Sequence, residues 1–230
     1  MRNNKVLLFI FICLFFFANI VYGENIRLLN GNAIIDELKG KIAKDPKNID
    51  DRIDLGAFYF QLQEYNLAKK YFEETLAIDP QNAVAYYNLG KTLIVLGEKM
   101  KGIKECEKAL ALGLDDINVY KTLALEYVTF KQYQRALEMY KNMQRLEPQN
   151  PYAYFAAGIM YMGYREGWKA REEFKKALEV DPNYVEAHNQ LAWMYGASEP
   201  EKAKYHYKRV LELDPNNAEA KKALEALNKV

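Results

Sequence analysis

The sequence predicts an all-α fold in which five similar helix pairs stack into a solenoid with a capping helix at each end. The first supporting observation is the spacing of the prolines that follow apolar helical runs. Successive intervals are 34, 68, 34 and 33 residues for Pro46, Pro80, Pro148, Pro182 and Pro215. Proline ends a helix because its ring clashes with a preceding carbonyl and the residue before it is pushed out of the helical region. The interval of 68 equals two periods of 34, with Leu114 in place of the proline expected between them.

The second observation is that residue types recur at fixed positions of the five units, which begin at residues 49, 83, 117, 151 and 185. Positions 4, 7, 8 and 11 share one face of a first helix, and positions 20, 24 and 27 share one face of a second. Positions 11 and 24 are mostly aromatic, and positions 8 and 20 are small. The small residues are Gly56, Gly90, Ala124, Gly158 and Ala192, and then Ala68, Gly102, Ala136, Ala170 and Ala203. Small residues let two helix backbones approach closely, and aromatic side chains fill the space beside that contact.

This pattern resembles the tetratricopeptide repeat family over nearly all of residues 34–230, because that family has a 34-residue period with proline near its end. The resemblance implies a right-handed superhelical solenoid whose five repeats span residues 49–82, 83–116, 117–150, 151–184 and 185–217. Residues 33–48 and 218–230 are amphipathic, and we expect them to form the N-terminal and C-terminal capping helices. Such caps are needed because each repeat buries its apolar face only against its neighbours.

The second repeat departs from the pattern at three positions. Gly102, Cys106 and Leu114 stand where alanine, an aromatic residue and proline are usual. Loss of the aromatic side chain removes packing volume, and glycine inside a helix costs about 0.5–1 kcal/mol relative to alanine. We therefore expect this helix pair to be the most loosely packed of the five.

The N-terminal residues are typical of a secretory signal. Arg2 and Lys5 give a positive start, and residues 6–18 form a continuous apolar segment of 13 residues. Val21 and Gly23 supply small residues for cleavage before Glu24. We interpret residues 1–23 as a signal peptide and residues 24–32 as a flexible lead-in, so the protein is expected to be exported, in the periplasm or elsewhere outside the cytoplasm. The alternative is an uncleaved segment that anchors the protein in the membrane.

Composition and motifs argue against nucleic-acid binding and against catalysis. The formal net charge is +1, so no basic domain is present to neutralise phosphates. His188 and His206 have no metal-ligand spacing; we expect His188 to pack in the core and His206 to lie at the surface. Cys106 occupies a packing position with no histidine in its repeat to act as a base. We therefore predict no catalytic residue, no metal, no cofactor and no enzymatic activity.

The resemblance also implies a binding groove, because the first helices of this family line a concave face with positions 2, 5, 9, 12 and 13. In this sequence those positions are unusually apolar and aromatic, and exposed apolar surface of this kind marks binding sites. The competing interpretation is that tight superhelical curvature, or the N-terminal helix, covers these residues. The predicted partner-binding residues are Tyr87, Lys91, Ile94, Lys121, Leu125, Tyr152, Phe155, Ile159, Met162, Asn189 and Trp193.

The function that follows is a non-enzymatic protein–protein interaction module or scaffold. It would capture an extended or helical segment of another protein through that segment's apolar side chains, with Lys91 and Lys121 orienting it. A carboxylate clamp is not supported, because only Asn88 matches the residues that the family uses for it. We expect Phe155→Asp to abolish capture without changing the melting of the protein. The first alternative is a structural assembly factor for an envelope secretion or pilus-type machine, acting through self-association or the convex face. The second is an enzyme or small-ligand binder.

Overall fold

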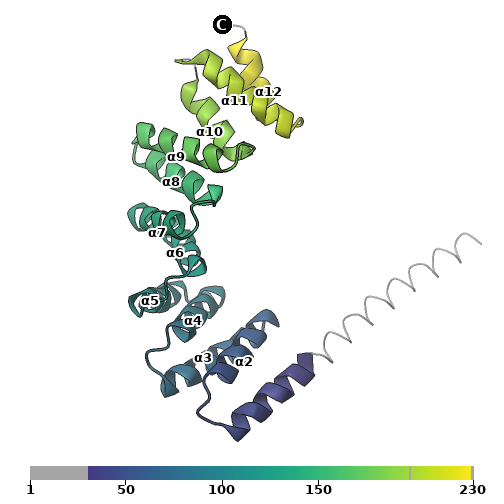
Figure 1. Ribbon diagram of the computed structural model, residues 1–230, viewed down its shortest axis with the longest axis vertical. Coiled ribbons are helices and arrows are strands. Elements are labelled where there is room, and N and C mark those ends of the chain that lie inside the picture. Colours follow the sequence, from purple (N-terminus) through teal and green to yellow (C-terminus); the bar gives the residue numbers. More distant parts are fainter. Residues whose placement is uncertain (1–30, 197, 229–230) are drawn as a thin grey trace, which may run out of the picture. The chain divides into compact units, whose positions relative to one another are not determined.

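The computed structural model describes residues 31–196 and 198–228, and these residues form helices joined by short loops, with no β-strand among them (Figure 1). The all-α fold class is therefore confirmed. The first helix spans residues 31–44. It is followed by α2 (Asp50–Gln61), α3 (Tyr65–Ile78), α4 (Ala83–Val95), α5 (Lys99–Ala111), α6 (Ile117–Thr129), α7 (Tyr133–Leu146), α8 (Pro151–Gly163), α9 (Gly167–Val180), α10 (Val185–Tyr195), α11 (Pro200–Leu213) and α12 (Ala218–Leu227).

The expected signal peptide and most of the expected lead-in lie outside the described residues. Residues 31 and 32, which we assigned to the lead-in, belong to the first helix. Among residues 31–196 and 198–228, no helix combines the length and the apolar character needed to cross a bilayer.

The chain divides into two compact units, and the division falls inside α5, between Glu105 and Cys106. In the part of the chain that is described, the first unit contains the helix of residues 31–44, α2, α3, α4 and the start of α5. The second unit contains the rest of α5 and α6 to α12. Helices that are consecutive in sequence pack against each other in each unit, as α2 does with α3 and α8 with α9.

Asparagine and aspartate side chains start several of the helices. Asn82, Asp116, Asn150 and Asn217 each accept a hydrogen bond from a backbone N–H in the first turn of the helix that follows, at 2.7–3.2 Å. Such caps satisfy backbone donors that have no partner inside the helix. The Asp-Pro-x-Asn turns thus end one helix and cap the next, which explains why the repeat boundaries are visible in the sequence.

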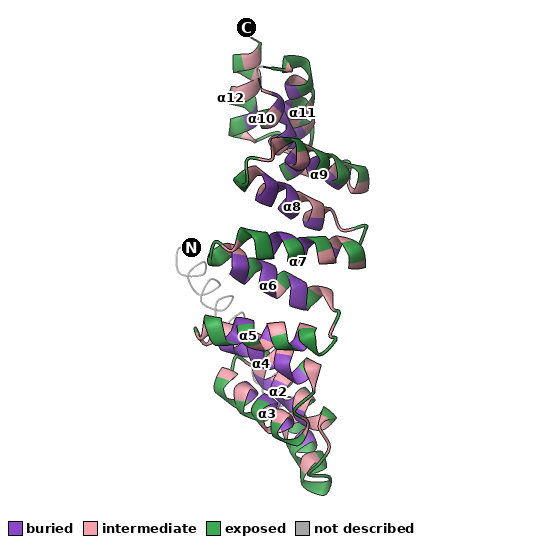
Figure 2. Ribbon diagram, turned by 90° about the vertical axis from the view of Figure 1, so that its left-hand side faces the viewer, coloured by how far each residue is buried: buried purple, intermediate pink, exposed green. Residues whose placement is uncertain are grey.

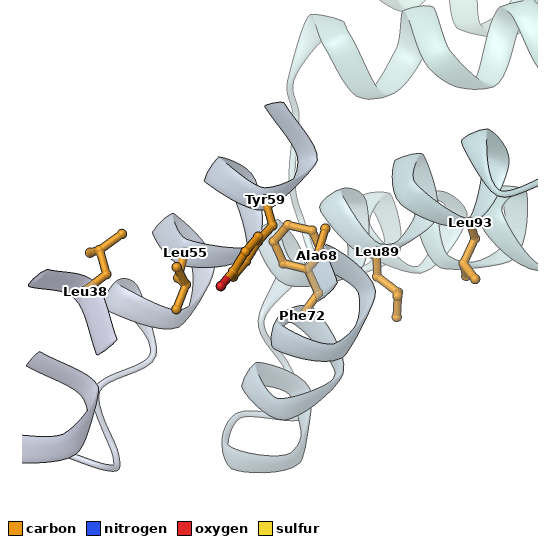
Figure 3. Close-up of a cluster of buried hydrophobic side chains, with 7 residues drawn as sticks. All are labelled: Leu38, Leu55, Tyr59, Ala68, Phe72, Leu89 and Leu93. Carbon is orange, nitrogen blue, oxygen red and sulfur yellow. The ribbon is translucent and has the colours of Figure 1, made fainter. Parts of the chain in front are cut away.

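The core of the first unit is a cluster of buried side chains from four helices (Figure 3). Its members are Leu38, Leu55, Tyr59, Ala68, Phe72, Leu89 and Leu93. Leu38 comes from the first helix, so that helix covers the apolar face of the first repeat. A Cβ atom added at Gly56 would lie 2.7 Å from the Phe72 ring, so the small residue at position 8 makes room for the aromatic residue at position 24.

Helices α4 and α5 approach each other too closely for a side chain at Gly102. A Cβ atom there would lie 2.5 Å from the carbonyl oxygen of Gly90 and 2.9 Å from the backbone nitrogen of Ile94. Positions 8 and 20 are both glycine in this repeat alone, and the two backbones meet directly. The expectation that this pair is loosely packed is therefore wrong at this point, because loss of side-chain volume is compensated by closer approach.

The second unit repeats the same construction. Figure 2 shows buried and exposed residues alternating along its helices, as expected of amphipathic helices with one apolar stripe. Phe174 is fully buried, and a Cβ atom at Gly158 would lie 2.5 Å from its ring. At the C-terminal end, Ala220 of α12 joins Ala192, Tyr207 and Val210 in one buried cluster. Helix α12 thus covers the last repeat, and its outer side remains solvent-exposed.

Candidate functional site

A pocket of about 380 Å³ lies in the second unit, and we call it the Trp193 pocket. It is lined by Phe155, Met162, Glu186, Asn189, Gln190, Trp193, Tyr207 and Glu219. These residues come from α8, α10, α11 and α12. Four of the eleven residues predicted for partner binding, namely Phe155, Met162, Asn189 and Trp193, are among them.

Helix periodicity explains how α8 and α10 present these side chains together. Phe155 and Met162 are seven residues apart, which places them on one face of α8 two turns from each other. Glu186, Asn189, Gln190 and Trp193 stand at i, i+3, i+4 and i+7 of α10, so they also share one face. The buried residues of both helices, such as Ala157 of α8 and Leu191 of α10, lie on other faces and pack in the core.

The aromatic residues of the pocket differ in how firmly they are held. The Phe155 ring lies 5.7 Å from the ring of Phe174 and 5.5 Å from that of Tyr184, centroid to centroid. Because Phe174 is fully buried, Phe155 belongs partly to the core. Trp193, in contrast, is 65% exposed. The structure does not support the expectation that Phe155→Asp leaves melting unchanged, since a charge would be placed against a buried ring.

The polar part of the pocket is acidic. Glu186 and Glu219 contribute carboxylates, and no lysine or arginine is among the lining residues. Burial raises the pKa of the Tyr207 hydroxyl, and the charge of Glu219 raises it further. The pKa of Tyr184 is raised in the same way, first by burial and then by Glu186. Both carboxylates thus act on phenol groups at or beside the pocket.

Four lining residues were not among the predicted eleven. Glu186 holds groove position 2 of the fifth repeat, and Glu219 holds the same position in the helix that follows. Counting repeat positions into the C-terminal cap would have found Glu219. Gln190 is at repeat position 6 and Tyr207 is at position 24. Position 6 is not among the groove positions and position 24 was assigned to the core, so the repeat pattern predicted neither residue for the groove.

A second pocket of the same unit, of about 300 Å³, contains two further predicted residues, Lys121 and Tyr152. Its lining residues are Ile117, Asn118, Lys121, Met143, Glu147, Asn150 and Tyr152. The Tyr152 ring lies edge-on to the buried Tyr140 ring at 6.1 Å. Lys121 shares this pocket with Tyr152 and with the carboxylate of Glu147, and none of the three lines the Trp193 pocket.

The remaining predicted residues line neither of these pockets. Leu125 on α6 is 47% exposed, and Ile159 on α8 is half-buried. Tyr87, Lys91 and Ile94 are on α4 and belong to the first unit. There the Lys91 ammonium lies over the rings of Phe60 and Tyr87, at 4.8 and 5.1 Å from their centroids. Lys91 is thus engaged in cation–π contacts within its own unit.

The two histidines form a pair between α10 and α11. Their Nδ1 atoms are 2.8 Å apart, and His188 Nε2 is 3.0 Å from the carbonyl oxygen of Pro182. Because a carbonyl only accepts, His188 Nε2–H donates to it, and His188 Nδ1 accepts from His206 Nδ1–H. The prediction that His206 lies at the surface is wrong, since its ring is partly buried and stacks on Tyr195 at 5.7 Å.

Both members of this pair are held in the neutral form. Burial, and to a smaller extent the neighbouring His188, lower the pKa of His206 to about 4. Burial is also the main reason that the pKa of His188 is lowered. Within residues 31–196 and 198–228, no three histidine, cysteine, aspartate or glutamate residues are grouped as metal ligands. Cys106 is a buried free thiol.

Comparisons with known proteins place these features in context. Residues 59–125 and residues 173–204 match two models of the tetratricopeptide repeat. No curated protein matches the sequence.

Several solved structures are similar in fold. YrrB, described as a TPR protein with an unusual peptide-binding site, is 21% identical with a TM-score of 0.70 over 84% of this chain and 98% of that one. MamA is 29% identical with a TM-score of 0.58 over 64% of this chain and 86% of that one. A second MamA, from Desulfovibrio magneticus RS-1, is 21% identical with a TM-score of 0.63 over 74% of this chain and 97% of that one.

Proposed function

Because the chain is a tetratricopeptide repeat protein, we propose that it is a non-enzymatic interaction module that holds a segment of another protein in the Trp193 pocket. One observation carries this proposal: an indole that is 65% exposed stands in a pocket of about 380 Å³ beside Phe155 and Met162. Exposed aromatic side chains in a concave site are the usual anchors of a protein interface. Burial of apolar partner side chains against them supplies the affinity.

Two further points support a peptide-like ligand. Pockets that hold small ligands or side-chain groups measure roughly 300–1,000 Å³, so this one suits a short stretch of a partner chain. YrrB, which shares the fold, is described as a protein with a peptide-binding site. In our chain the pocket is open to solvent at Trp193, so a segment can enter without local unfolding.

The proposal includes an exported location, outside the cytoplasmic membrane. It rests on the secretory-type pattern of residues 1–23. Cleavage would leave Cys106 as the single cysteine, so the exported chain would be stabilised by its core and not by an internal disulfide. The intact mass of the protein recovered from its native cells tests this point. A chain that starts at Glu24 supports export with cleavage, and a full-length chain in the membrane fraction supports anchoring.

Site-specific photo-crosslinking tests the binding function. Two variants are expressed in the native cells. A photoreactive phenylalanine analogue replaces Trp193 in the first and Trp168 in the second. Both residues are exposed, at 65% and 69%, but only Trp193 lines the pocket. The proposal predicts a discrete crosslinked partner at position 193 that is absent or different at position 168. Crosslinks at position 168 alone would contradict it.

A structural assembly factor is the second candidate, and exposed aromatic residues outside the pockets favour it. Trp168 and Tyr205 are 69% and 58% exposed, and neither lines the Trp193 pocket or the second pocket, which contains Lys121 and Tyr152. Such side chains suit self-association or a second contact surface. Analytical ultracentrifugation separates the two candidates. Concentration-dependent assembly that Trp168→Ala abolishes would favour the assembly factor.

A further inference from the structure

We propose that the Trp193 pocket selects partner segments in which a lysine or arginine side chain stands next to an apolar one. This inference rests on the proposed function and names the chemistry of its ligand. The sequence analysis assigned the charged contacts of the groove to Lys91 and Lys121, whereas the charged residues of this pocket are carboxylates.

The first step is the charge of the lining. Two of the eight lining residues, Glu186 and Glu219, are carboxylates, and the others are neutral. Neither forms an ion pair with any residue in the described ranges, whereas other glutamates of the second unit pair with lysine or arginine, as Glu173 does with Lys176 and Glu199 with Arg171. The pocket therefore presents negative charge that the chain itself does not neutralise.

The second step is the comparison between repeats. Glu186 and Glu219 occupy repeat position 2 at the starts of α10 and α12, where α4, α6 and α8 have Val84, Asn118 and Tyr152 and α2 of the first unit has Asp50. A carboxylate in the first turn is stabilised by the helix dipole. That effect acts on all these helices, yet α4, α6 and α8 have no carboxylate at this position, so the helix dipole alone does not explain the two glutamates that line the pocket.

The third step is the neighbouring aromatic surface. A lysine or arginine side chain has an apolar stem and a charged head, so it can pack along an indole while its head reaches a carboxylate. The chain shows such a contact at its other tryptophan, where the Lys169 ammonium lies 5.4 Å from the Trp168 ring. Among the described residues no cationic side chain lies over Trp193. A partner cation fits that place, and Phe155 and Met162 receive the adjacent apolar side chain.

Selection from a phage-displayed library of random peptides tests the inference. The full chain is the bait, with two parallel baits, Trp193→Ala and the double variant Glu186→Gln, Glu219→Gln. Urea unfolding of each bait confirms that it is folded. We expect peptides with lysine or arginine beside an apolar residue to be enriched on the wild type, and this basic preference to be lost on the double variant.

A titration then gives the magnitude. In the Trp168→Phe chain, Trp193 is the single tryptophan, so its fluorescence reports on the pocket directly. A selected peptide and the same peptide with norleucine in place of its basic residue are compared. We expect about fivefold to tenfold weaker binding of the norleucine peptide at low salt, the size typical of partly exposed ion pairs and cation–π contacts. The double variant should bind both peptides equally.

The outcomes separate this inference from the proposed function. Enriched peptides that depend on Trp193 but carry no basic residue would overturn the charge preference and leave groove binding standing. Enrichment that is the same on wild type and Trp193→Ala would overturn both. A basic preference that survives the double variant would show that Glu186 and Glu219 are not its source, and would also overturn the inference.

Discussion

Replacement of Gly102 by alanine should destabilise the protein, although helix propensity alone predicts the opposite. Alanine is favoured over glycine in a helix by about 0.5–1 kcal/mol. At this site, however, the added Cβ atom would lie 2.5 Å from the Gly90 carbonyl oxygen, 2.7 Å from a side-chain carbon of Ile94 and 2.9 Å from the Ile94 nitrogen. Two of these three atoms are backbone atoms of α4, so relief requires the helices to separate.

The expected size follows from these two opposing effects. Overpacking of a tight contact costs about 1–3 kcal/mol, which exceeds the gain in propensity. We therefore predict a net loss in the free energy of unfolding of about 1 kcal/mol, and up to about 2 kcal/mol if α4 and α5 cannot adjust. The sign is the informative part, because it depends on the closeness of the two backbones.

Urea unfolding followed by far-ultraviolet circular dichroism measures this change, and Gly40→Ala is the matched control. Gly40 is inside the helix of residues 31–44, in the same unit, and a Cβ atom there would have no neighbour within 4 Å. Gly40→Ala should raise the unfolding midpoint, and Gly102→Ala should lower it. A Gly102→Ala protein that is stabilised as much as Gly40→Ala would refute the close-contact argument.

Two further predictions concern the second unit. Phe155→Asp should lower the free energy of unfolding by roughly 2–4 kcal/mol, because it removes the ring that packs on buried Phe174 and places a charge there. Trp193→Ala should change the free energy of unfolding by less than about 1 kcal/mol, because the Trp193 side chain is mostly exposed. Urea unfolding of both variants checks this, and equal stabilities would count against it. Stability should also fall as the pH drops from 6.5 towards 4, because the unfolded state binds a proton on His206 that the folded state, with a pKa of about 4, does not. The difference in pH dependence between wild type and His206→Phe measures this, and identical slopes in that window would show that the histidine pair is not responsible.

The helix pairs and their boundaries could be predicted because their causes are local in sequence. The Asp-Pro-x-Asn turns, as at Asp79 and Asn82, end one helix and cap the next within four residues. Small residues such as Gly56 mark where two helices touch. These signals repeat with the period of the fold, so the fold class follows from the sequence alone.

The features that sequence reasoning missed depend on distances between helices. The sign of the Gly102 effect is set by how closely α4 and α5 approach. His188 and His206 are eighteen residues apart, and their 2.8 Å contact appears only when α10 packs on α11. Lys91 was assigned to a ligand, but it lies over the rings of Phe60 and Tyr87.

For the candidate site, the repeat positions identified the helix face but not its charge. Phe155, Met162, Asn189 and Trp193 were predicted by counting along the repeats, and they line one pocket. Glu219 lies in the C-terminal cap, where we did not continue the count, and Tyr207 reaches the pocket from a position that usually packs in the core. The acidic character of the site therefore became visible only in the structure.

The central claim is that Trp193 anchors a partner segment, and one affinity measurement tests it most directly. The partner recovered by crosslinking is titrated calorimetrically against the wild type, Trp193→Ala and Trp168→Ala. If the pocket is the binding site, Trp193→Ala raises the dissociation constant by about tenfold or more, as expected for an interface hot spot, and Trp168→Ala leaves it unchanged. Equal affinities of the wild type and Trp193→Ala would contradict the account.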